Sequence, residues 1–185
     1  MQKKLLKLLF QVTASLFFIL ITVQAEAYDS HFATDIDHRS CMLLLEDGSE
    51  WKVSNFDSNE LFVWKTQSLE IPVKITPNYF SNYFTYYITN QNTGSYVRAN
   101  LVTSPLRNNP YAITITGIDN NSYERGSVYL SNGTFWHVHF SDLELIRNWY
   151  LDDLIIIGKN NNWFSYNTHI LINIHTNTFV RVQRL

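Results

Sequence analysis

The chain has 185 residues, of which 45% are hydrophobic, 15% aromatic and 16% charged, and its formal net charge is −2 at pH 7. This composition excludes a charge-rich disordered chain, and the lack of a basic surplus argues against a nucleic-acid-binding protein. The single cysteine excludes an intramolecular disulfide framework and a cysteine-rich zinc site.

The first 27 residues have the pattern of a secretory signal peptide. Three lysines precede an apolar run over residues 8–23, and Ala25-Glu26-Ala27 is the small-x-small pattern that a signal peptidase accepts. The run is shorter than the roughly 20 residues that span a bilayer. We therefore predict cleavage after Ala27, with an uncleaved anchor as the alternative. After cleavage we expect no membrane span and an exported protein in the periplasm, at the cell surface or outside the cell.

The mature chain is predicted to contain one unit twice. Residues 28–40 show no clear pattern and are expected to form an N-terminal arm. The first repeat is expected over residues 41–102 and the second over residues 123–185. Residues 103–122 are expected to connect them, with an alternating strand from Tyr111 to Ile118.

The duplication is visible as LEDGSEWKV, which begins at Leu45, and LSNGTFWHV, which begins at Leu130. Continuing the alignment without a gap matches Lys74 with Lys159, and a shorter loop in the second copy then restores the match of later residues. Because tryptophan is rare, its repeated pairing is hard to obtain by chance. The shared signature residues are Gly48 with Gly133, Trp51 with Trp136, Trp64 with Trp149, Asp57 with Asp142, Asn90 with Asn173 and Arg98 with Arg181.

Each copy is predicted to be a small all-β unit. The Asp-Gly and Asn-Gly dipeptides at Gly48 and Gly133 favour two-residue hairpins. Asp57 and Asp142 are placed to cap a short helix, and further strands follow. We expect about five antiparallel strands per copy, closed into a barrel-like unit that could be SH3-like, with the tryptophans in its core. Two such small units are expected to pack together.

A resemblance adds to this interpretation. The string Leu-x-Asp/Asn-Gly-Ser/Thr-x-Trp-x-Val, followed by Trp, Leu-x-Ile, Asn-x-x-Thr and Val-Arg, resembles an exported tandem-repeat family of uncharacterised proteins from chlamydia-like bacteria. The resemblance covers residues from about Leu43 to Leu185. It implies an exported, bacterial, all-β protein and supplies no catalytic residues.

An aromatic stretch over residues 78–87, interleaved with asparagines, is the main candidate for ligand contact, and residues 162–166 are its counterpart. Exposed aromatic rings beside amides can stack on sugar rings or anchor a protein partner. The alternative is that half of these rings fill a barrel core. The candidate binding residues are Tyr79, Phe80, Tyr83, Trp163 and Phe164.

His137 and His139 are the candidate metal ligands, because residues two apart on a strand point to one face. The first copy has Lys52 and Ser54 at these positions, so the default interpretation is a pair of solvent-facing residues. A hydrolase or metal-dependent enzyme at this pair is the alternative function, and it would need a third ligand, for which His169 and Asp153 are the candidates.

The sequence contains no nucleophile elbow and no phosphate-binding loop. We therefore expect an exported, non-enzymatic binding or envelope-associated module with no cofactor. Its partner would be a protein or a glycan of the cell envelope.

Overall fold

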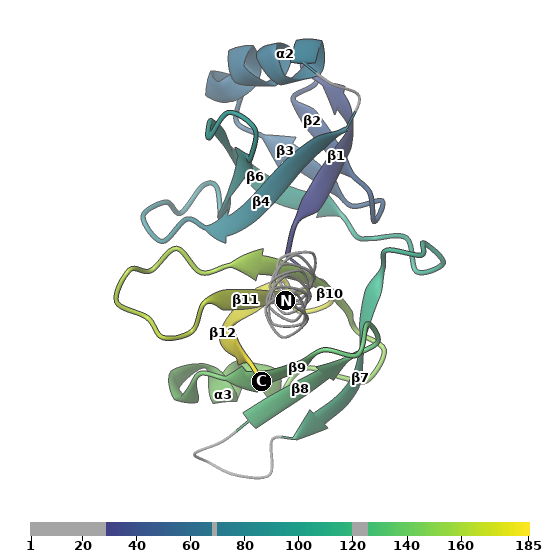
Figure 1. The fold of residues 1–185 in the computed structure, drawn as a ribbon, viewed down its shortest axis with the longest axis vertical. Helices are drawn as coiled ribbons and strands as arrows, with labels where there is room; N and C mark the ends of the chain where they lie inside the picture. The colour runs from purple at the N-terminus through teal and green to yellow at the C-terminus, as the bar shows by residue number, and fades with distance from the viewer. Residues whose placement is uncertain (1–28, 68–69, 120–125) are drawn as a thin grey trace, which may run out of the picture. The chain divides into compact units, whose positions relative to one another are not determined.

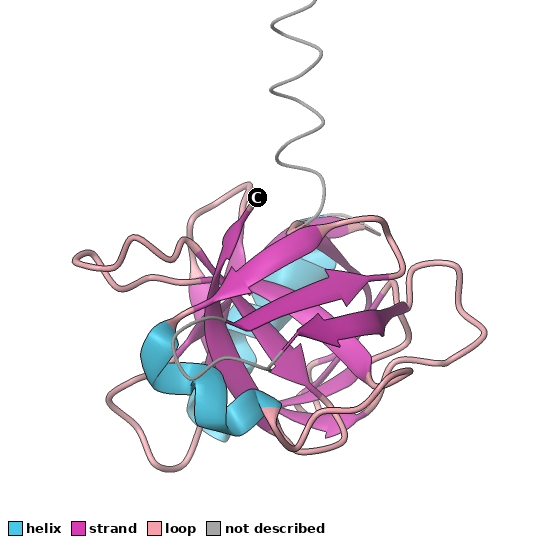
Figure 2. Cartoon of the chain, turned by 90° about the horizontal axis from the view of Figure 1, so that it is seen from below, coloured by secondary structure: helices cyan, strands magenta, loops and turns pink. Residues whose placement is uncertain are grey.

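The computed structural model describes residues 29–67, 70–119 and 126–185. The predicted signal peptide, residues 1–27, lies outside the described residues and stays a prediction. Strands form most of the regular structure (Figure 2). Within the described ranges, no helix has both the length and the apolar character needed to cross a membrane.

The first half of the described chain forms a closed antiparallel barrel of six strands (Figure 1). The strand order around it is β1-β2-β3-β6-β5-β4, and β1 pairs with β4 to close the sheet. Two short helices connect β3 to β4. The elements are β1 (His31–Asp37), β2 (Met42–Leu45), β3 (Glu50–Val53), η1 (Asn55–Asp57), α2 (Ser58–Gln67), β4 (Ile71–Pro77), β5 (Tyr86–Asn90) and β6 (Tyr96–Thr103).

The second barrel repeats this topology with the order β7-β8-β9-β12-β11-β10, closed by pairing of β7 with β10. The tandem all-β architecture predicted from the repeat is therefore confirmed. The elements are β7 (Ile113–Asp119), β8 (Gly126–Leu130), β9 (Phe135–Val138), η2 (Phe140–Asp142), α3 (Leu143–Ile146), β10 (Leu154–Lys159), β11 (His169–Asn173) and β12 (Thr178–Arg184).

Each barrel has six strands rather than the five expected. The additional strands are β1 and β7, which lie in the segments expected to be an arm and a connection. A β-bulge interrupts both, between Ala33 and Asp35 in β1 and between Ile115 and Gly117 in β7. In β1 the bulge breaks the alternation of buried and exposed residues by which a strand is recognised in a sequence.

The hairpin turns at Gly48 and Gly133 have three-residue loops, not the two-residue loops predicted. In the first, Leu45 and Ser49 pair across the loop, and the Gly48 N–H donates to the Leu45 carbonyl at 3.0 Å. The glycines have φ of 85° and 78°, while the residues before them keep negative φ. This is a type I turn followed by a left-handed glycine. The Asp47 carboxylate accepts the Ser49 N–H at 2.8 Å and stabilises the turn.

Each barrel is filled around two tryptophans, as the repeat predicts. Trp51 and Trp64 are fully buried in the first core, and Trp136 and Trp149 are buried in the second. A buried indole N–H needs an acceptor. All four donate to hydroxyl groups at matching positions, namely Ser49 and Ser95 in the first barrel and Thr134 and Thr178 in the second.

The strand register corrects the alignment of the two repeats beyond the tryptophans. When Asn90 and Asn173 are matched, the pairing of neighbouring strands matches Lys74 with Ile156 and not with Lys159. Helix α3 has 4 residues where α2 has 10. The second copy is therefore shortened in its helical segment, before β10 begins.

The second barrel packs its outer face against the first. Ile156, Ile170 and Ile172 alternate with the residues that fill the second barrel, and they are buried with the core of the first. Gly158 lets the two backbones approach closely, because a Cβ there would lie 2.8 Å from the Ile75 carbonyl oxygen. The contact between the barrels is thus a continuation of one hydrophobic core.

Candidate functional site: an aromatic groove beside the contact of the barrels

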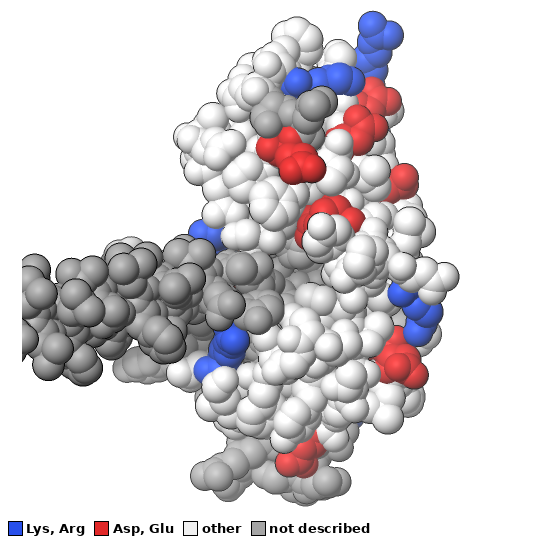
Figure 3. Space-filling model, turned by 45° about the vertical axis from the view of Figure 1, so that its right-hand side comes forward, with Lys and Arg blue, Asp and Glu red and all other residues white. Residues whose placement is uncertain are grey.

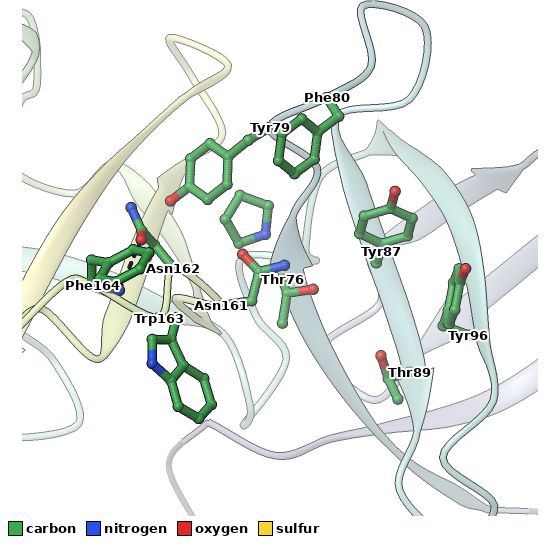
Figure 4. A pocket seen from close by; sticks show the side chains of 11 residues that line it. Thr76, Tyr79, Phe80, Tyr87, Thr89, Tyr96, Asn161, Asn162, Trp163 and Phe164 are labelled. Carbon is green, nitrogen blue, oxygen red and sulfur yellow. Dashed lines mark hydrogen bonds between the residues drawn. The ribbon is translucent and has the colours of Figure 1, made fainter.

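An open groove of about 740 Å³ lies where two corresponding loops meet, one from each barrel (Figure 4). Residues 78–85 connect β4 to β5, and residues 160–168 connect β10 to β11. We call this hollow the aromatic groove. It is lined by Thr76, Pro77, Tyr79, Phe80, Tyr87, Thr89, Tyr96, Asn161, Asn162, Trp163 and Phe164.

The groove brings together four of the five aromatic residues that the sequence singles out. Tyr79 and Phe80 come from the first loop, and Trp163 and Phe164 come from the second, as labelled in Figure 4. Tyr83 lies on the first loop but outside the lining, and it is 86% exposed. Contact of these rings with a ligand stays a prediction.

Asparagine side chains hold the backbone of the second loop. Asn160 Oδ1 accepts the Asn162 N–H at 3.0 Å, and Asn162 Oδ1 accepts the Phe164 N–H at 3.1 Å. Asn160 Nδ2 also donates to the Asn167 carbonyl at 2.7 Å. Asparagine favours such turns because its side chain replaces a backbone partner. The loop is therefore ordered without using the faces of its aromatic rings.

Tyr79 ties the two loops together. Its hydroxyl donates to Asn160 Oδ1 at 3.0 Å, and its ring packs edge-on against Phe179 of the second barrel, with centroids 6.2 Å apart. Burial raises the pKa of Tyr79, so the hydroxyl remains a donor at neutral pH. Tyr79 thus connects the two loops that line the groove.

The floor of the groove is the outer face of β4, β5 and β6. In the second barrel the corresponding outer face packs against the first barrel, and the residues on that face are apolar. In the first barrel the matching residues carry hydroxyl groups and remain partly exposed, which suits reversible contact with a ligand. The pairs that match in strand register are Tyr87 with Ile170, Thr89 with Ile172 and Tyr96 with Phe179.

The tips of the groove expose large apolar surfaces. Phe80, Trp163 and Phe164 are 97%, 92% and 90% exposed. Scattered exposed aromatics are ordinary, but a contiguous exposed apolar patch marks an interaction site. These three rings line one groove, so exposed apolar surface is gathered at a single place on the molecule.

Among the residues that the structure describes, the lining of the groove is uncharged, since it consists of aromatic, threonine, proline and asparagine residues. On the face shown in Figure 3, the charged side chains are scattered among uncharged ones. Phosphate and carboxylate ligands are usually held by arginine or lysine. The groove therefore favours a neutral ligand.

His137 lies in β9, and His139 follows the end of that strand. His139 Nδ1 is 2.7 Å from Ser141 Oγ, and burial together with the nearby Arg181 lowers the pKa of His139. Of the two candidates for a third ligand, Asp153 accepts the Tyr150 N–H at 2.9 Å, and His169 Nε2 lies 2.9 Å from Lys159 Nζ. Residues 29–67, 70–119 and 126–185 contain no group of three His, Cys, Asp or Glu side chains that could hold a metal. The metal-dependent alternative stays a prediction from the sequence.

The sequence interpretation missed an ion pair in each barrel. Asp57 was expected to cap a helix, but it accepts from Arg98 Nη2 at 2.7 Å and from the Arg98 backbone N–H at 2.9 Å. Asp142 and Arg181 form the same pair at 2.6 Å, and Asp142 caps no helix with its side chain. Burial would raise the pKa of each aspartate, but the arginine hydrogen bonds lower it. The only signal for these pairs was their presence in both copies.

Comparisons of the chain with protein families, with curated proteins and with solved structures found no match.

Proposed function

We propose that this protein is an exported, non-enzymatic binding module that holds a neutral glycan of the cell envelope in the aromatic groove. The observation that carries the proposal is the grouping of exposed Phe80, Trp163 and Phe164 beside hydroxyl and amide groups. Aromatic faces pack against the C–H faces of sugar rings, and hydroxyls and amides exchange hydrogen bonds with sugar hydroxyls. The volume of about 740 Å³ is in the range of small-ligand sites.

Two features favour a glycan over other ligands. Each sheet closes into a barrel, so its strands are paired on both sides and a peptide gains no strand edge to extend. The uncharged lining provides no cation for an anionic polymer. Export and an envelope location rest on the predicted signal peptide.

The experiment is isothermal titration calorimetry of the protein with soluble oligomers of N-acetylglucosamine, glucose and mannose and with peptidoglycan fragments. We expect one class to bind, and Trp163→Ala to weaken it by at least about tenfold, a loss of about 1.4 kcal/mol. Tyr166→Ala is the matched control, because Tyr166 lies on the same loop and is 90% exposed but is outside the lining. Its dissociation constant should stay within about twofold of the wild type.

Equal losses in the two variants would place the binding site outside the groove. If no oligomer binds, the glycan proposal is wrong. Crosslinking of the protein to envelope proteins, with Trp163→Ala as the comparison, would then test a protein partner.

A further inference from the structure

A second hollow, of about 480 Å³, adjoins the aromatic groove on the first barrel. Tyr87 and Tyr96 line both hollows, and their rings meet edge to face with centroids 5.1 Å apart. A ligand that crosses these two rings therefore contacts both hollows. Beyond them, the second hollow is lined by Phe56, Asp57, Asn59, Glu60 and Arg98.

Arg98 is held in a fixed orientation in this hollow. Its Nε and Nη2 donate to the Asp57 carboxylate at 2.9 Å and 2.7 Å, and the Phe56 ring centroid lies 6.0 Å from its guanidinium carbon. Among the described residues, Nη1 of Arg98 has no hydrogen-bond partner. The ion pair thus fixes the guanidinium at the lining of the hollow and uses only part of its donors.

Glu60 supplies an acceptor in the same hollow. One of its carboxylate oxygens accepts the Trp64 indole N–H at 2.9 Å, and the other has no hydrogen-bond partner in the described part of the chain. A sugar hydroxyl both donates and accepts, so Glu60 and Arg98 together match it. Two carboxylates and one guanidinium give the hollow a net negative charge, which disfavours an anionic sugar.

The second barrel provides an internal comparison. There the corresponding guanidinium, of Arg181, also donates to Ser141 Oγ at 2.6 Å. The residue before the paired aspartate is Ser141 in the second barrel and Phe56 in the first. The ion pair therefore does not require an aromatic neighbour. Phe56 is nevertheless 89% exposed at the second hollow, where a ring can contact a ligand.

We propose that this hollow is a second subsite of the aromatic groove, and that the ligand is a neutral oligosaccharide rather than a single sugar. The inference rests on the proposed function, in which Trp163 and its neighbours bind one part of the chain. The oligosaccharide then crosses Tyr87 and Tyr96. A further sugar unit packs against Phe56 and exchanges hydrogen bonds with Arg98 and Glu60.

The test is titration with β-1,4-linked oligomers of N-acetylglucosamine and of glucose, of two, four and six units. We expect the six-unit oligomer to bind at least about tenfold more tightly than the two-unit oligomer. Phe56→Ala should remove most of this gain and leave the two-unit affinity unchanged. Trp163→Ala should weaken both lengths. Phe140→Ala, at a 71% exposed ring on η2 of the second barrel, is the matched control and should change neither.

Equal affinity for all lengths would overturn the second subsite and leave the proposed function in place. The same conclusion would follow if Phe56→Ala bound the six-unit oligomer as the wild type does. If no oligomer of N-acetylglucosamine, glucose or mannose binds and no peptidoglycan fragment binds, both the subsite and the proposed function are wrong. Because Phe56 is exposed, unchanged circular dichroism of the variant is expected and separates these outcomes from misfolding.

Discussion

His31 lies at the contact between the barrels, with acceptors beside both nitrogens of its ring. Nδ1 is 2.8 Å from Glu46 Oε1, and Nε2 is 2.9 Å from the carbonyl oxygen of Ile157 in the second barrel. An imidazole donates from both nitrogens only when it is doubly protonated. Burial lowers the pKa of His31, but the hydrogen bond and charge of Glu46 outweigh it and raise the pKa from 6.5 to about 9.

This pair makes stability depend on pH. Because the pKa is higher in the folded state, its contribution is complete below pH 6.5 and is lost as the pH rises through about 9. The difference of about 2.5 between the pKa of His31 in the folded and the unfolded protein corresponds to about 3 kcal/mol in the free energy of unfolding. At the acid end, burial raises the pKa of Glu46, but the hydrogen bond and charge of His31 lower it. The contribution therefore also falls as Glu46 becomes protonated.

The assay is urea unfolding followed by tryptophan fluorescence at several pH values between about 6 and 10, for the wild type and for His31→Gln. The free-energy difference between the two proteins should shrink by about 3 kcal/mol over this range. Contributions that are common to both proteins cancel in the difference. His175→Gln, at an exposed position, is the control and should follow the wild type.

A difference that stays constant from about pH 6 to 10 would refute this reasoning, because the charge of His31 would then not stabilise the fold. A nuclear magnetic resonance titration of the His31 ring gives an independent check. Its midpoint should lie well above that of an exposed histidine.

Further predictions concern the cores and the ion pairs, all measured by urea unfolding. Trp51→Ala should cost about 3–5 kcal/mol because the side chain is fully buried, whereas Trp163→Ala, at a 92% exposed position, should cost less than about 0.5 kcal/mol. Gly158→Ala should cost about 1–3 kcal/mol, since its Cβ would meet the Ile75 carbonyl oxygen at 2.8 Å, and an unchanged midpoint would contradict this close approach. Asp142→Asn should cost about 1–3 kcal/mol through its lost charged hydrogen bonds, and a neutral result would show that the pair is only a surface contact.

The features that could be read from the sequence are those with local signals. Repeated tryptophans and the glycine turns at Gly48 and Gly133 predicted two similar all-β units, and the barrels confirm them. The cluster of aromatic and asparagine residues directed attention to the loops that line the groove. This local signal exists because asparagine favours turns and aromatic rings favour contact with a ligand or a core, whatever the rest of the fold.

Other features were set by contacts between distant segments. The bulge in β1 hid the sixth strand of the first barrel, because it breaks the alternation along the chain. The strand now labelled β7 was expected, but only as a connection, because its pairing with β8 and β10 joins distant segments. Asp57 and Arg98 are far apart in sequence and meet only when β6 reaches η1. The sequence around Asp57 does not contain Arg98, and the sequence around Arg98 does not contain Asp57. Each residue was therefore given a separate role.

The sequence by itself determined that the chain has two β units, with a buried pair of tryptophans in each and aromatic loops between their strands. Only the tertiary structure decided which faces of the barrels meet. Ile170 and Ile172 are buried against the first barrel, while the matching Tyr87 and Thr89 remain open at the groove. The physical reason is that alternation along a strand tells which residues share a face, but the packing of one barrel on the other decides whether that face is covered.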